Sequence, residues 1–171
     1  EGMVDEGLEL VRAVRDRYDG ERRNPWNEIE CGSNYARSMA SYALLLAFSG
    51  FSCDMTRGHL GFNPIRLGEG PHRFLWSVDA AWGTVEFDGS IVRLSVVEGS
   101  IELASLGLGS LGDEPSRVTV AGREVRFTWS ESSVRFAERI RIGAGETLWV
   151  EAAEGQARRR DVPRGERPAN R

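Results

Sequence analysis

The sequence predicts an α+β fold, in which two helices come first and an antiparallel β-rich region follows. Residues 4–18 and 34–49 repeat apolar side chains every three or four positions, which is the spacing of helix faces. From Phe74 onward the spacing changes to two, which is typical of strands that bury alternate side chains. This change of period separates a helical part from a strand-rich part.

The first predicted helix carries a single apolar stripe, and Asp19-Gly20 ends it. The stripe consists of Val4, Leu8, Val11, Val14 and Tyr18. The second predicted helix is apolar nearly all round, and Gly50 is its expected C-cap. A helix of this kind is buried on several sides, which one partner helix cannot achieve. We therefore expect the complete polypeptide to extend upstream of Glu1.

About seven short strands are expected between Phe74 and Val150, in one antiparallel sheet or in a sandwich. Turns are expected at residues 98–100, 121–123 and 143–145, the last two as hairpin turns. The alternation also predicts that four tryptophans pack in the core. These are Trp76, Trp82, Trp129 and Trp149.

The composition excludes several classes of function. With 40% hydrophobic residues, 28% charged residues and a net charge of -4, the chain is typical of a globular protein without a nucleic-acid partner. No apolar run is long enough for a transmembrane helix. The sequence leaves the cellular compartment open.

No motif indicates a cofactor or a metal. Phosphate loops, nucleophile elbows and metalloprotease motifs are absent. His59 and His72 are each expected in a loop, away from any cluster of ligands. Cys31 and Cys53 are expected to be reduced, buried thiols.

The candidate site is the loop at residues 24–37, Asn-Pro-Trp-Asn-Glu-Ile-Glu-Cys-Gly-Ser-Asn-Tyr-Ala-Arg, between the two predicted helices. Pro25 forces the chain out of helix, and residues 32–34 supply the turn and N-cap chemistry for the next helix. A loop that ends at a helix N-terminus presents polar groups well. Without further information, Glu28 and Glu30 could equally cap that helix or pair with arginines.

The run Arg23-Asn-Pro-Trp-Asn-Glu-Ile-Glu-Cys-Gly-Ser-Asn-Tyr-Ala-Arg-Ser-Met-Ala-Ser-Tyr resembles the last active-site segment of glycoside hydrolase family 116. These enzymes are retaining β-glycosidases related to non-lysosomal glucosylceramidase. Ala13-Val-Arg-Asp-Arg-Tyr-Asp-Gly and Gly58-His-Leu-Gly-Phe-Asn-Pro extend the resemblance to about residues 5–65. A run of this length is more specific than a short motif.

The resemblance implies that the two helices are the terminal hairpin of an (α/α)6 barrel. It also implies that Glu28 and Arg37 contact the hydroxyls of the glycone of a β-glucoside, with supporting roles for nearby residues. The possible supporting residues are Trp26, Asn27, Glu30 and Tyr35. The nucleophile and the acid/base would come from the upstream part of the same polypeptide, so this segment holds no catalytic residue and should be inactive alone. No cofactor is implied.

The predicted organisation is therefore a helical hairpin with the active-site loop (residues 1–66), an antiparallel β-rich region (67–151) and a disordered tail (152–171). Two alternatives remain open. The chain could be a non-catalytic carbohydrate-binding or structural β-module, or it could come from a family member that has lost its catalytic carboxylates.

Overall fold

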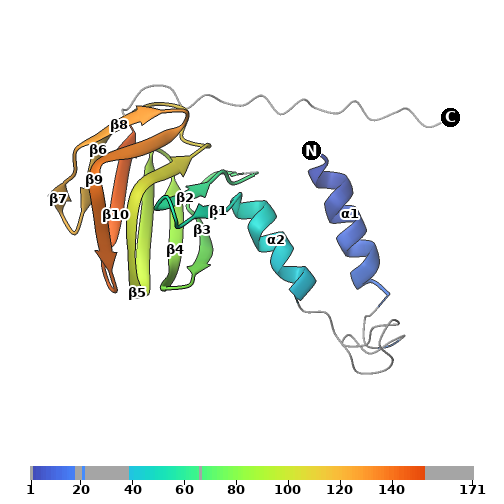
Figure 1. Cartoon of the computed structure of the whole chain (residues 1–171). Coiled ribbons are helices and arrows are strands. Elements are labelled where there is room, and N and C mark those ends of the chain that lie inside the picture. The colour runs from blue at the N-terminus through green and yellow to red at the C-terminus, as the bar shows by residue number, and fades with distance from the viewer. Residues whose placement is uncertain (1, 18–20, 22–38, 66, 153–171) are drawn as a thin grey trace. The chain divides into compact units, whose positions relative to one another are not determined.

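The computed structural model describes residues 2–17, 21, 39–65 and 67–152 (Figure 1). Its helices are α1 (Val4–Arg15) and α2 (Met39–Ser49). Its strands are β1 (Ser52–Asp54), β2 (His59–Phe62), β3 (His72–Val78), β4 (Ala81–Asp88), β5 (Ile91–Leu108), β6 (Pro115–Val120), β7 (Arg123–Glu124), β8 (Phe127–Ser130), β9 (Ser133–Gly143) and β10 (Thr147–Ala152).

The predicted fold class is wrong. Strands dominate the described part of the chain, and its two helices are only 12 and 11 residues long. No residue of α1 is buried, and Tyr42, Leu45 and Leu46 of α2 are at least half exposed. The fold is therefore a β-rich domain and not a helical hairpin that precedes an antiparallel region. Apolar periodicity shows which face a helix can bury, but it does not supply the surface that buries it.

The chain divides into two compact units, residues 1–44 and 45–171. In the first, α1 has Asp5 and Glu6 in its first turn and Arg12 and Arg15 in its last, which complements the helix dipole. Neither described helix is long and apolar enough to cross a membrane.

The end of α2 is fixed to the strand-rich unit. Gly50 has a φ of +57° and confirms the predicted C-cap. A Cβ atom there would lie 2.3 Å from the carbonyl oxygen of Asn63, so only glycine fits. The Asn63 N–H donates to the Ser49 carbonyl (3.2 Å) and the Ile65 N–H donates to the Phe48 carbonyl (3.1 Å).

The strands form two sheets that share β5. In the first sheet the order is β3-β4-β5-β10-β6-β7, and in the second it is β1-β2-β5-β9-β8. Figure 1 shows β5 beside both β4 and β9. The expectation of a purely antiparallel arrangement fails at one place, because β2 runs parallel to β5.

One hydrophobic core joins the inner faces of the two sheets. Its fully buried members include Leu60, Phe62, Trp76, Leu94, Ile101, Leu103, Leu106, Leu108, Ile142 and Leu148. The core prediction for the tryptophans is confirmed for Trp76, and Trp129 packs partly against the core. It is wrong for Trp82 and Trp149, which are 40% and 36% exposed.

Strand β5 passes from one sheet to the other at Gly99, where the sequence predicted a turn. Residues 91–99 pair with β4, whereas residues 100–107 pair with β9. Gly99 has a φ of +82°, and a Cβ atom there would lie 2.0 Å from the Ala80 carbonyl oxygen. The chain therefore bends without ending the strand.

The hairpin predicted around residues 121–123 is confirmed in shortened form, because β6 pairs antiparallel with β7 across Ala121-Gly122, whereas the turn at residues 143–145 does not form a hairpin. At residues 143–147 the chain leaves β9 in the second sheet and enters β10 in the first, so this turn is a corner that crosses between sheets. The turn at Ala121-Gly122 joins β6 only to the short β7. The following strand, β8, pairs with β9 in the other sheet.

We predict that Gly99→Ala destabilises the chain much more than Gly122→Ala. Both glycines have positive φ values, +82° and +78°, so each alanine incurs a left-handed strain of about 1–2 kcal/mol. Only Gly99 lies against another backbone, since nothing is within 4 Å of a Cβ at Gly122. The clash should add about 1–3 kcal/mol, which urea unfolding would measure. Equal losses from the two variants would contradict the proposed constraint on β5.

Candidate functional site

A row of polar residues crosses the outer face of the second sheet. The strand register places Asp54 opposite His59, His59 opposite Ser105, and Ser105 opposite Arg135. Arg135 lies opposite Thr128. Residues paired across neighbouring strands project from the same face of a sheet, and the buried Leu60 and Leu106 occupy the other face, so these five side chains point away from the core.

The adjacent row consists of small residues only. Its members in strand order are Ser52, Gly61, Gly107, Ser133 and Ser130. The imidazole of His59 uses the space that the two glycines leave. A Cβ atom on Gly61 would lie 3.2 Å from its Nε2, and one on Gly107 would lie 3.3 Å from its Cε1. The glycines therefore allow the ring to lie along the sheet.

An irregular pairing of β5 with β9 creates a hollow beside these rows. Leu103 pairs with Ile140 and Ser105 pairs with Arg135. An advance of two residues along β5 therefore corresponds to an advance of five residues along β9. The additional residues leave the ladder. Ala104 is anchored instead by the Gly58 carbonyl, which accepts its N–H at 2.8 Å. Bulges of this kind often lie next to functional sites.

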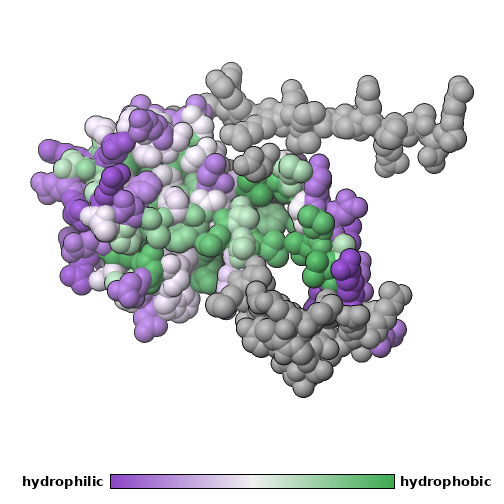
Figure 2. All heavy atoms as spheres, turned by 45° about the vertical axis from the view of Figure 1, so that its right-hand side comes forward, coloured by the Kyte–Doolittle hydropathy of each residue, from purple (hydrophilic) through white to green (hydrophobic). Residues whose placement is uncertain are grey.

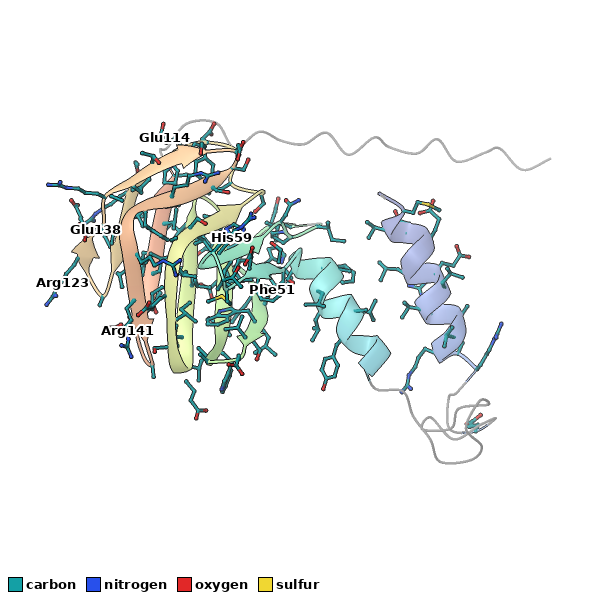
Figure 3. All side chains as sticks on the ribbon, viewed as in Figure 1. Phe51, His59, Glu114, Arg123, Glu138 and Arg141 are labelled. Atoms are coloured by element: carbon teal, nitrogen blue, oxygen red, sulfur yellow. The ribbon has the colours of Figure 1, made fainter. Side chains whose placement is uncertain are left out.

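The result is a cleft of about 540 Å³. Asp54, Arg57, His59, Ser105, Glu131 and Arg135 supply its polar groups, and Ala104, Ser133 and Phe136 complete its lining. Figure 3 labels His59, which lies on β2. Figure 2 shows hydrophilic residues spread over the visible face of the strand-rich unit. The volume lies within the range of small-molecule sites, about 300–1,000 Å³.

At one end of the cleft, the β1–β2 turn fixes an ionised carboxylate. Asp54 accepts hydrogen bonds from the hydroxyl of Thr56 (2.5 Å) and the backbone N–H of Arg57 (3.2 Å). The Arg57 guanidinium lies 3.4 Å from the same carboxylate. These groups, the Thr56 hydroxyl first, hold the pKa of Asp54 below its ordinary value of 3.8.

At the other end, the β8–β9 turn presents a second carboxylate. Glu131 and Ser132 have φ values of +51° and +55°, as the two central residues of a type I′ hairpin turn require. The Arg135 guanidinium donates to Glu131 at 3.0 Å and to the Ser130 hydroxyl at 2.9 Å. The cleft thus has a paired carboxylate and guanidinium at each end.

His59 and Ser105 lie between the two ends, and His59 Nδ1 and Ser105 Oγ are 2.8 Å apart. The loop expectation is wrong for both histidines, because His59 lies in β2 and His72 lies in β3. Cys53 is an exposed thiol and not a buried one. No group of three or more potential metal ligands occurs among the residues that the structure describes.

The six residues assigned to the glycone pocket lie outside the described residues. These are Glu28, Arg37, Trp26, Asn27, Glu30 and Tyr35. Cys31 and the predicted tail from residue 153 onward also lie outside them. The cleft on the second sheet is a separate feature that the sequence did not predict. Its one local signal is Asp54-Met-Thr-Arg-Gly58, which has the composition of a tight polar turn.

Among known proteins, a solved structure shows a weak similarity to this chain. No protein-family model matches the chain, and no curated protein matches it. A solved glycoside hydrolase, a GH127 β-arabinofuranosidase, is similar with a TM-score of 0.38 and 15% identity. The match covers 57% of this chain and 18% of the hydrolase chain.

We predict that Thr56→Val raises the pKa of Asp54 towards 3.8, because it removes the main hydrogen bond to the carboxylate. A depressed folded-state pKa stabilises the fold above the unfolded pKa, and this contribution is lost as the pH falls through the folded value. The difference in the free energy of unfolding between the parent chain and the variant should therefore become smaller as the pH falls through the folded-state pKa of Asp54. NMR titration of the carboxyl carbon and urea unfolding across this pH range would measure both effects.

The control is Thr128→Val, which changes an exposed threonine of β8 on the same sheet face. It should leave the titration of Asp54 unchanged. An unaltered Asp54 midpoint in Thr56→Val would refute the assigned cause of the shift.

Proposed function

We propose that this chain is part of a retaining β-glycosidase that acts on β-glucosides. The observation that carries the proposal is the continuous run from Arg23 to Tyr42, which resembles an active-site segment of glycoside hydrolase family 116. In this proposal the run supplies the groups that bind the glycone. The chemistry of its side chains supports such a role.

Glu28 would accept hydrogen bonds from adjacent sugar hydroxyls, and Arg37 would donate hydrogen bonds in a planar fork. Each hydrogen bond to a charged group contributes about 1.5–3 kcal/mol. Asn27, Glu30 and Tyr35 would hold these two side chains in position, while Trp26 would stack on the sugar or fill the loop.

Hydrolysis with retention requires two carboxyl groups about 5–5.5 Å apart, one as nucleophile and one as acid/base. In the proposal both come from sequence outside residues 1–171, so Glu28 and Glu30 bind the substrate or support that binding and do not break the bond. Residues 1–171 alone should then hydrolyse no β-glucoside. The reaction needs no cofactor.

The test uses the complete polypeptide and p-nitrophenyl β-D-glucoside. Glu28→Gln and Arg37→Gln should each lower kcat/KM by about 10- to 100-fold, which corresponds to the loss of one charge-assisted hydrogen bond. Glu9→Gln and Arg12→Gln are the matched controls, because they change exposed charges on α1. Unchanged kcat/KM in both loop variants would refute the assigned roles. A complete polypeptide without β-glycosidase activity would refute the proposed function.

A second candidate function is a carbohydrate-binding or structural β-module. It is favoured by one specific observation: the strand-rich unit has a continuous hydrophobic core and an outer cleft of its own. The activity test separates the two functions, since a module requires no hydrolysis by the complete polypeptide.

A further inference from the structure

We propose that the cleft on the outer face of the second sheet binds a neutral oligosaccharide. This site lies on β1, β2, β5 and β9 and the adjoining turns. It shares no residue with the loop at 24–37. The inference is independent of the proposed glycosidase activity and deepens the second candidate function, and it is argued from the described side chains alone.

The charges of the cleft favour a ligand without net charge. Two carboxylates and two guanidiniums line it, and each carboxylate is already paired, Asp54 with Arg57 and Glu131 with Arg135. An anion or a cation would have to compete with one member of an existing pair. A neutral ligand leaves both of these solvent-exposed pairs intact.

The hydrogen-bonding groups favour a ligand rich in hydroxyls. Carboxylates only accept hydrogen bonds and guanidiniums only donate them, whereas a sugar hydroxyl does both. A hydroxyl can therefore donate to Asp54 or Glu131 and accept from the neighbouring arginine. At the centre, Nε2 of His59 has no hydrogen-bond partner among the described residues, although Nδ1 is bonded to Ser105. This nitrogen is available to a ligand.

The dimensions favour more than one sugar ring. The polar row from Asp54 to Arg135 crosses four strands and hence three gaps, which is roughly 14 Å at ~4.8 Å per gap. A single pyranose ring does not extend over that distance, whereas a short oligosaccharide does. Phe136 and Ala104 give the cleft an apolar wall for the C–H groups of the rings.

The row of small side chains leaves space beside the polar groups of the cleft. Ser133 belongs to that row and also lines the cleft. A larger side chain at this position would occupy the space in which a ring lies. This gives a variant that blocks the site without changing any charge.

The test is an NMR titration of the ¹⁵N-labelled chain with cellotriose and xylotriose as neutral probes and inorganic phosphate as the anionic probe. At least one trisaccharide should shift the backbone amides of Ser105 and Ser133 and saturate, and phosphate should not shift them. Arg135→Gln should weaken the binding about tenfold, the equivalent of one charge-assisted hydrogen bond. Ser133→Leu should abolish the binding.

The matched control is Arg117→Gln in the first sheet. Arg117 and Glu124 form a pair of the same length as Arg135 and Glu131, 3.0 Å, with comparable exposure of both side chains. This variant should bind as the parent chain does. The amide spectrum of each variant verifies that it is folded.

Three results would overturn the inference. The first is that neither trisaccharide shifts these amides at its highest soluble concentration, and the second is that phosphate shifts them instead. The third is that Arg135→Gln and Arg117→Gln weaken binding equally. Because this test measures binding to strand residues and not hydrolysis, its outcome is independent of the outcome for the proposed glycosidase activity.

Discussion

The architecture depends on one strand that belongs to two sheets. β5 pairs with β4 and β10 in its first half and with β9 and β2 in its second half. The passage occurs at Gly99, whose missing side chain lets the backbone lie against Ala80. Because both inner faces continue along the same strand, the two sheets bury a single core. The corner between β9 and β10 lies beside this passage, since Gly143 pairs with Ser100 and Thr147 pairs with Ser95.

The cleft arises where the regular ladder of that strand is interrupted. β9 has three more residues than β5 needs between Arg135 and Ile140, and their departure from the ladder opens the hollow beside Ala104. The carboxylates come from the end of β1, which supplies Asp54, and from the β8–β9 turn, which supplies Glu131. Rigid paired strands hold the row of His59 and Ser105 between them. In binding proteins, a rigid scaffold commonly positions the functional side chains of its loops in this way.

The two candidate sites rest on different kinds of evidence. The loop at residues 24–37 was found from its sequence, because a long run of specific residue types resembles a known active-site segment. The cleft could not be found in this way. Asp54, His59, Ser105 and Arg135 are far apart in the sequence, and only the register of four strands makes them neighbours.

By itself, the sequence determined that a helix-patterned part precedes a strand-patterned part and that Gly50 ends α2, but it placed the first strands near Phe74, whereas they begin at Ser52. The two correct predictions concern local properties, set by side-chain periodicity and by the conformational freedom of single residues. The tertiary structure decided that β2 runs parallel to β5, that the chain bends at Gly99 where a turn was expected, and that Trp82 and Trp149 are exposed while Trp76 is buried. Alternation assigns a tryptophan to one face of a strand, but which face meets the core depends on pairings between distant segments.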